Sequence, residues 1–392
     1  MTLDDARIRE LLRFDDEDGV LSFYVGHTPA QAADPQPTTP IEIRNQLKAL
    51  KTELADRDGL GPKVEARLER SKPDIDRLLD PHASGRGRAL FVGVASGRTE
   101  WVSLQIPFRE RVVHHDSAFV RPLVAAHDEG RPAGVLDVSS DAIRLLVWSH
   151  GEVSELWTRD FEVVDDVTSR SKGGPSTGRP ASRARSHRDD FDDRIHQNFQ
   201  RLLVATCEEV ATEATERRWD RLVVGGNAKL RDDAHKLLVD ALPAGTRVLT
   251  SEHNVPTAPH EIATQVWPLL RSVHLDREAD LVAEAVDRGL GGKGGAVGLR
   301  NVCEALNEGR VMHLLFAGDL ELEGFRSDED TLHPRVEGSI AQSDSVELHR
   351  EPLFVERMIE KAVSTGATVT PVEPDIAGPL REHEGVAALL RW

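Results

Sequence analysis

The spacing of apolar residues in the first third of the chain predicts a mixed α/β domain. Short apolar runs typical of buried strands occur at 20–25, 89–94 and 101–106. Between the first two runs, Ile43, Leu47, Leu50 and Leu54 recur at intervals of four, three and four residues. These intervals place all four side chains on one face of a helix.

The middle of the chain predicts a strand meander followed by alternating strands and helices. Three runs with strand composition lie close together at 134–138, 143–148 and 152–158. A long helix with an apolar stripe is predicted from Asp189. Strand and helix patterns then alternate at 222–226, 232–242 and 247–250. This order is typical of a layered α/β domain.

The last third again mixes helix and strand patterns, so the predicted fold class is α/β throughout. Helices are expected at 281–286, 297–306 and 354–363, and strands at 311–316 and 367–372. Polar, turn-rich joints and the length of the chain divide it into three expected domains: 1–127, 128–272 and 273–392.

Charge and cysteine content exclude several classes of protein. The 392 residues include 49 Lys+Arg and 67 Asp+Glu, a formal net charge of −18, so the chain is no general binder of nucleic acid or anionic membranes. Two cysteines cannot form a disulfide scaffold, and both are expected in apolar cores. No secretory signal or membrane span is evident, and a cytoplasmic location is expected.

Three candidate sites are weak. The run Gly291–Gly295 lacks the spacer and the Ser/Thr of a phosphate-binding loop. The 16 histidines show no zinc spacing, so no metal and no cofactor are expected. Asp137, at the end of a predicted strand, would suit a metal-dependent nuclease, but no partner carboxylates can be named from the sequence.

The informative segment is basic and turn-rich. Residues 169–188 contain six Lys/Arg, three glycines and two prolines, and no Asp or Glu. Glycine and proline at this density oppose regular structure, so a long loop is predicted at 168–188. Its predicted phosphate-binding residues are Arg170, Lys172, Arg179, Arg183, Arg185 and Arg188. We expect this loop to contact RNA.

The same segment resembles the central domain of archaeo-eukaryotic release factors. Residues 173–179 read Gly-Gly-Pro-Ser-Thr-Gly-Arg, and a basic run and a long helix follow. In that family the loop reads Gly-Gly-Gln-Ser-Ala-x-Arg-Phe before basic residues and a long helix. The closing segment 385–392 is similar to the last strand of Pelota and release-factor C-terminal domains. The resemblance covers roughly residues 130–392, and the preceding part resembles the α/β domain of the bacterial branch.

The resemblance implies both a fold and a site of action. It implies a ribonuclease-H-like central domain carrying the basic loop, followed by a C-terminal α/β/α sandwich. It also implies docking in the ribosomal A site, with the loop toward the CCA end of peptidyl-tRNA. The expected partners are the ribosome, its rRNA and peptidyl-tRNA, with a translational GTPase as a further candidate. No membrane partner is expected.

Pro175 departs from the family motif at the residue that matters for hydrolysis. The two residues before it, Gly173 and Gly174, match the motif, and together the three form the candidate catalytic loop. In hydrolysing members the backbone N–H of the third residue, Gln, faces the oxyanion of the reacting ester. Proline has no N–H and a fixed φ. Efficient peptide release by the usual mechanism is therefore not expected.

The sequence leaves more than one function open. The first hypothesis is a translation factor that binds ribosomes, either to rescue stalled ones or to protect idle ones. The alternative is a peptidyl-tRNA hydrolase or tRNA-end nuclease that acts through the rearranged Gly-Gly-Pro loop. A third hypothesis is an adaptor that holds another protein through its C-terminal domain.

Overall fold

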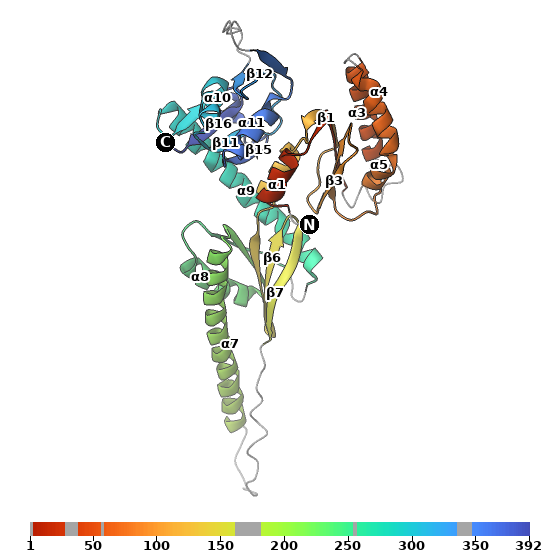
Figure 1. Ribbon diagram of the computed structural model, residues 1–392. Helices are drawn as coiled ribbons and strands as arrows, with labels where there is room; N and C mark the ends of the chain where they lie inside the picture. The colour runs from red at the N-terminus through yellow and green to blue at the C-terminus, as the bar shows by residue number, and fades with distance from the viewer. Residues whose placement is uncertain (1–2, 28–37, 56–58, 161–181, 254–256, 335–346) are drawn as a thin grey trace. The chain divides into compact units, whose positions relative to one another are not determined.

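The computed structural model describes residues 3–27, 38–55, 59–160, 182–253, 257–334 and 347–392, with the backbone alone at 38 and 182–198 (Figure 1). The chain divides into two compact units. One unit is Pro132–Val273, and the other combines Met1–Arg131 with His274–Trp392. The second unit is thus built from two segments that lie far apart in the sequence.

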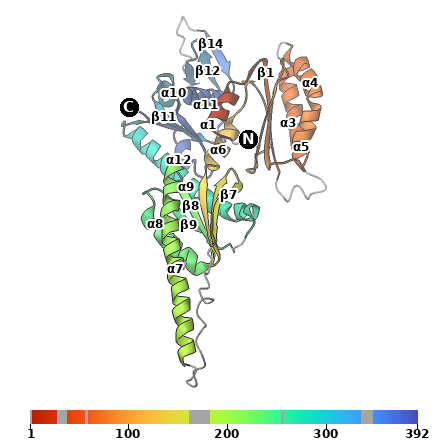
Figure 2. The same cartoon turned by 60° about the horizontal axis from the view of Figure 1, so that its bottom comes forward.

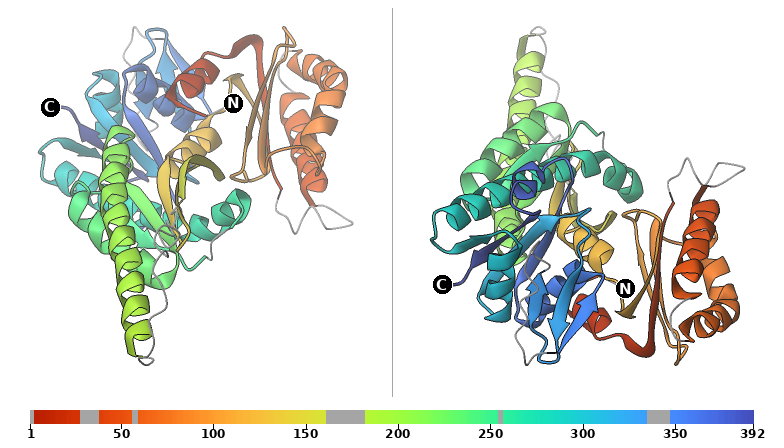
Figure 3. Two further views of the ribbon diagram at one scale, coloured as in Figure 1. Left: turned by 90° about the horizontal axis from the view of Figure 1, so that it is seen from below. Right: turned by 90° about the horizontal axis from the view of Figure 1, so that it is seen from above.

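The N-terminal part of this two-segment unit is an antiparallel sheet in the order β3-β2-β1-β4. Its strands are β1 (Asp15–Gly26), β2 (Gly87–Gly93), β3 (Thr99–Leu104) and β4 (Arg111–Ser117). Its helices are α1 (Asp5–Leu12), α3 (Thr38–Ala55), α4 (Leu60–Arg70) and α5 (Lys72–Leu79). Leu21 and Phe23 of β1 share a core with α3, α4 and α5. These three helices therefore cover one face of the sheet (Figure 3).

The C-terminal part of the same unit contains a sheet in the order β10-β16-β11-β15. These strands are β10 (Gly295–Val297), β11 (Val311–Ala317), β15 (Thr368–Val372) and β16 (Val386–Leu390). The helices are α9 (Pro259–Leu290), α10 (Leu299–Asn307), α11 (Phe354–Ser364) and α12 (Gly378–Arg381). Val282 and Ala285 of α9 pack on Leu315 and Leu389. Leu314, on the opposite face of β11, is also buried, and α10 and α11 contact this sheet.

A small sheet and a connecting helix complete this unit. The small sheet has the order β13-β12-β14, formed by β12 (Gly324–Ser327), β13 (Leu332–Pro334) and β14 (Leu348–Glu351). Helix α6 (Arg121–Glu129) follows β4 and contacts β15. Nε of Arg121 in α6 donates to Glu356 of α11 at 2.7 Å, and both side chains are buried. These contacts explain why the first and last segments form one unit.

The unit Pro132–Val273 contains a five-stranded sheet in the order β7-β6-β5-β8-β9. Its strands are β5 (Ala133–Val138), β6 (Ala142–Ser149), β7 (Glu152–Asp160), β8 (Arg221–Gly226) and β9 (Arg247–Thr250). The first three pair antiparallel, and β5, β8 and β9 pair parallel. Helices α7 (Ser182–Glu216) and α8 (Ala228–Ala241) pack on one face, and the first half of α9 packs on the other. The predicted meander and strand–helix alternation are confirmed.

Two helices differ from the sequence predictions. Helix α7 begins at Ser182, seven residues earlier than predicted. Helix α9 is continuous over 32 residues, with Pro268 inside it, so the boundary between the two units at 273/274, next to the predicted joint at 272/273, lies within a helix. Neither of these helices, nor any other in the described part of the chain, is both long and apolar enough to cross a membrane.

Candidate functional site

The predicted basic loop leaves the central sheet at the edge where its parallel strands end. Asp160, the last residue of β7, pairs with Ala142 of β6, and the neighbouring Ile143 pairs with Val138, the last residue of β5. Val138 pairs in turn with Gly226 at the end of β8. Three strands therefore end at one edge. Ligands of open α/β sheets bind at the carboxyl ends of parallel strands.

The predicted site residues fall on both sides of the boundary of the described structure. Arg170, Lys172, Gly173, Gly174, Pro175 and Arg179 lie outside the described residues. Arg183, Arg185 and Arg188 lie in the first turns of α7, so the prediction of a loop as far as residue 188 was wrong there. All glycines and prolines of the segment precede residue 181, and the alanines and arginines that follow favour a helix.

Helix α7 is long enough to project from the sheet that holds its other end. Its 35 residues span about 52 Å at 1.5 Å per residue. Phe199, Leu203 and Val210 in its C-terminal half belong to the apolar core on this sheet. The N-terminal half of the helix extends beyond the edge of the sheet (Figures 1 and 2). Arg183, Arg185 and Arg188 are therefore carried away from the core of this unit.

Polar contacts hold the base of this helix. Arg159 of β7 forms an ion pair with Glu209 of α7, and its guanidinium lies 4.9 Å from the ring centroid of Trp157. Gln200 of α7 donates to Asp233 of α8 at 3.3 Å. The base of α7 is thereby tied to both of its neighbours, which fixes the direction in which the helix leaves the sheet.

A buried chain of three polar residues lies at the same edge. Nε2 of His253 donates to Oδ1 of Asp137, and Nδ1 of His253 lies 2.8 Å from Oγ of Ser251. The side chains of Asp137 and His253 are fully buried. Gly225 of β8 makes room for the imidazole, since a Cβ there would lie 2.0 Å from its Cε1. The sequence analysis named Asp137 as a candidate but missed His253, which lies 116 residues after Asp137.

Asp137, His253 and Ser251 together do not have the composition of a metal-dependent nuclease site. Such a site needs several carboxylates converging on the metal. The observed partner of Asp137 is a histidine, and its Oδ2 is buried without a hydrogen-bond partner among the described residues. These buried hydrogen bonds connect β5 with the segment that follows β9.

One group in the described part of the chain has donors that could hold a metal ion: Asp128, His274 and Glu278. Their ligand atoms lie within 4.8 Å of one another, and all three are buried. Arg277 already donates to Asp128 at 2.6 Å, and Nε2 of His274 lies 3.0 Å from Glu278. Burial opposes ionisation of Asp128, but Arg277, His274 and Arg131 together lower its pKa. Arg277 already supplies the positive charge that a metal ion would bring to Asp128. Charge balance therefore favours an ion-pair cluster over a metal site.

Both cysteines lie in apolar cores, as predicted. Cys207 of α7 and Cys303 of α10 are free and buried. Desolvation raises the pKa of each thiol to about 12. Since the thiolate is the reactive species, neither cysteine suits nucleophilic chemistry near neutral pH.

Searches of known proteins and solved structures find distant similarities. YocB of Bacillus subtilis (strain 168), an uncharacterized protein, is 19% identical over 233 residues, which cover 58% of this chain and 86% of YocB. The archaeal translation termination factor aRF1 is 16% identical with a TM-score of 0.25, covering 100% of this chain and 99% of aRF1. Archaeoglobus fulgidus Pelota is 17% identical with a TM-score of 0.36, covering 78% and 79%.

A family model gives the specific assignment. Residues 119–269 match the model of Bacterial archaeo-eukaryotic release factor family 10. The matched region contains the complete five-stranded sheet, the basic segment and α7. The resemblance to the bacterial branch of the archaeo-eukaryotic release factors is therefore confirmed by the family-10 match over residues 119–269.

Proposed function

We propose that this protein is a ribosome-binding translation factor. It docks in the A site and directs segment 168–188 toward the CCA end of peptidyl-tRNA. It acts in the rescue of stalled ribosomes or in the protection of idle ones, by occupying the site and not by efficient hydrolysis. The observation that carries the proposal is the match of residues 119–269 to a release-factor family, because that region contains the basic segment.

The distribution of charge supports RNA as the target of this segment. The whole chain has a formal net charge of −18, yet residues 169–188 carry six positive residues and no acidic ones. A local concentration of Lys and Arg in an acidic protein suits contacts with phosphates at one place and disfavours nonspecific coating. The long α7 supplies a rigid support for part of this segment.

The chemistry of the candidate loop favours occupancy over catalysis. Pro175 cannot donate the backbone hydrogen bond that stabilises the oxyanion in hydrolysing relatives. A metal-dependent nuclease site at Asp137 also lacks support, because Asp137 is paired with His253 and belongs to no metal-compatible group in the described ranges.

Ribosome co-sedimentation over a range of salt concentrations tests the proposal. The test variant replaces Arg170, Lys172, Arg179, Arg183, Arg185 and Arg188 by Ser. The matched control replaces five exposed arginines and one lysine elsewhere by Ser: Arg9, Arg44, Arg70, Arg86, Arg300 and Lys72. Both variants change the net charge equally, so only the position of the lost charges differs.

The test variant is expected to bind ribosomes more weakly and with a flatter salt dependence. Each lost phosphate contact lowers the slope of log K against log salt by roughly 0.7–0.9. The control is expected to bind like the wild type. Equal binding of all three proteins at every salt concentration would exclude the basic segment as the RNA contact.

A further inference from the structure

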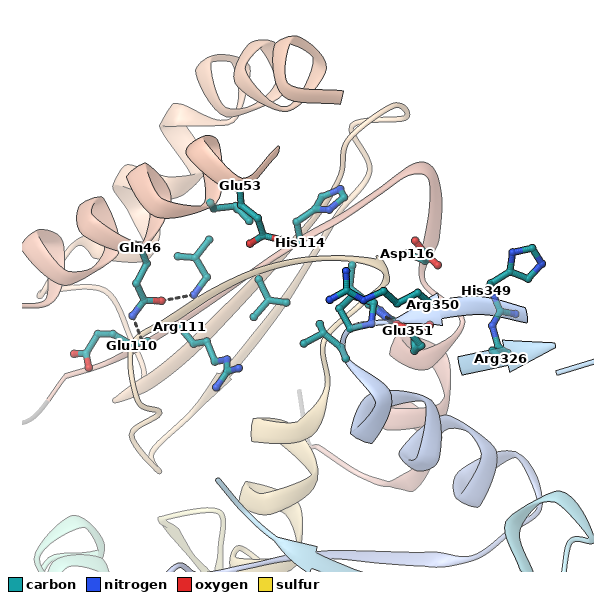
Figure 4. A pocket seen from close by; sticks show the side chains of 16 residues that line it. Gln46, Glu53, Glu110, Arg111, His114, Asp116, Arg326, His349, Arg350 and Glu351 are labelled. Atoms are coloured by element: carbon teal, nitrogen blue, oxygen red, sulfur yellow. Dashed lines mark hydrogen bonds and ion pairs between the residues drawn. The ribbon is translucent and has the colours of Figure 1, made fainter. Parts of the chain in front are cut away.

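A pocket of about 750 Å³ lies within the unit formed by Met1–Arg131 and His274–Trp392. Its walls come from α3, β4, β12 and the end of β14 (Figure 4). A volume of this size is within the range of small-molecule sites, roughly 300–1,000 Å³. Neither the family match nor the proposed function assigns a role to this pocket.

The floor of the pocket is a buried, fully paired polar network. Nε2 of His115 lies 3.2 Å from Oε1 of Glu351, and both side chains are less than one-tenth exposed. Arg357 donates to the other Glu351 oxygen at 2.7 Å and to Asp116 at 2.7 Å. Burial opposes ionisation of Glu351, but His115 and Arg357 lower its pKa to about 2. Arg357 thus partly balances the charges of Glu351 and Asp116, and it also donates to Glu360 at 2.8 Å.

Arginines with unused donors line the pocket above this floor. Arg350 of β14 uses one nitrogen on Glu323, at 2.8 Å. Arg326 of β12 forms a single long ion pair, at 3.8 Å, and its Nε has no hydrogen-bond partner among the described residues. Figure 4 shows both side chains at the β14 end, together with His349. Guanidinium groups with free N–H donors recognise phosphate and carboxylate groups by paired hydrogen bonds.

The opposite end of the pocket contains carboxylates and also Arg111, which already forms an ion pair with Glu321 at 2.7 Å. Glu53 and Glu110 lie there with Gln46, close to α3 (Figure 4). The amide of Gln46 is fixed, since it donates to the carbonyl oxygen of Glu110 at 3.0 Å and accepts from the N–H of Val112 at 2.7 Å. The apolar part of the pocket wall is formed by Leu50, Val112 and Leu353. The pocket therefore offers arginine donors at the β14 end, and carboxylate acceptors next to the paired Arg111 at the other end.

We infer that this pocket binds a nucleotide, with its phosphate at Arg326 and Arg350 and its sugar or base at Glu53 and Glu110. A nucleotide combines an anionic end, a flat ring suited to apolar walls, and hydroxyl or amino groups that donate to carboxylates. The same chemistry is offered by a free mononucleotide and by one nucleotide of a single-stranded RNA. An acidic peptide would satisfy the arginines but would meet repulsion at the Glu53 and Glu110 end.

Calorimetric titration of the full-length protein tests this inference. The probes are the four ribonucleoside 5′-monophosphates, the four nucleosides, inorganic phosphate, a short single-stranded RNA of mixed sequence, and a polyglutamate peptide. The test variant is the double replacement Arg326→Gln and Arg350→Gln. The control variant is Arg300→Gln with Arg381→Gln, two exposed arginines of the same unit that do not line the pocket.

At least one monophosphate is expected to bind the wild type, with an affinity about tenfold or more above those of its nucleoside and of inorganic phosphate. The test variant should lose this binding at least tenfold, and the control should keep it. If the RNA binds tighter than every monophosphate and loses that affinity in the test variant, the nucleotide belongs to an RNA chain. If the RNA binds as tightly as the best monophosphate or more weakly, the ligand of the pocket is a free nucleotide.

Three results would overturn the inference. They are no binding of any nucleotide at millimolar concentration, tighter binding of polyglutamate than of any nucleotide, and nucleotide binding that is unchanged in the test variant. The basic segment 168–188 lies in the other unit, and its serine variant should bind mononucleotides like the wild type. Failure of the ribosome experiment and failure of this one are therefore distinguishable.

Discussion

His253 and Asp137 are 116 positions apart in the sequence, yet they form a buried pair at the carboxyl edge of the central sheet. Asp137 is the penultimate residue of β5, and His253 follows β9, the last parallel strand. The pair closes the edge next to the end of β7, from which the basic segment departs.

Replacing Gly225 by Ala is expected to destabilise the protein by about 1–3 kcal/mol, the usual cost of overpacking a core. The new Cβ would lie 2.0 Å from Cε1 and 2.3 Å from Nε2 of His253, so the imidazole would have to leave Asp137. Chemical denaturation measures the loss. The matched control is Gly378→Ala, because nothing lies within 4 Å of a Cβ built there. Equal stability of the two variants would contradict the tight contact with His253.

Arg357 is expected to be the most sensitive member of the ion-pair network below the pocket. It donates to Glu351, Glu360 and Asp116 at 2.7–2.8 Å. Arg357→Met removes the only arginine that contacts the buried Glu351 among the described residues, and breaking such a pair costs about 3–5 kcal/mol. The control is Arg381→Met, whose pair with Asp319 is half exposed and should cost less than about 1 kcal/mol. A similar melting temperature for both variants would argue against the network.

His313 should make stability depend on pH between about 6.5 and 4. Burial, assisted by Arg277 and Arg131 and opposed by Asp128, lowers its pKa from 6.5 to about 4. Between these values the unfolded chain binds more protons than the folded one, so stability falls as the pH decreases through this window. Below about 4 this contribution is fully lost.

The variant His313→Gln is expected to flatten the melting-temperature profile over that window. Glutamine can keep a hydrogen bond to Thr370, which lies 2.9 Å from Nε2 of His313, while it removes the titrating group. The exposed His82→Gln serves as the control and should leave the profile unchanged. A His313→Gln profile as steep as that of the wild type would show that another group dominates.

Pro175→Gln is expected to add peptide-release activity to a protein that otherwise has little. The substitution restores both the backbone N–H and the side-chain amide of the release-factor motif. The gain should stay below the roughly hundredfold that one oxyanion donor is worth, because Pro180 also departs from the motif. Release of labelled peptide from purified ribosome complexes measures it, with Pro180→Gln as the control. Rapid release by the wild type would favour the hydrolase alternative.

The sequence alone determined the elements and the composition of the central domain. Apolar periodicity located the meander and the strands that follow it, because burial on a sheet or helix face imposes a period on the residues themselves. The basic segment and Pro175 could also be read directly, since charge and a missing N–H are properties of single residues. These local features were sufficient to predict the family before the fold was known.

The tertiary structure decided which distant residues meet. The pairing of Asp137 with His253 and the joining of Arg121 to Glu356 cross more than one hundred residues, and no local period encodes such contacts. Helix α9 runs through the predicted domain boundary because its two halves pack on different sheets, and that packing outweighs the effect of Pro268. The pocket likewise exists only because β4 and β14, remote in sequence, form walls of one cavity.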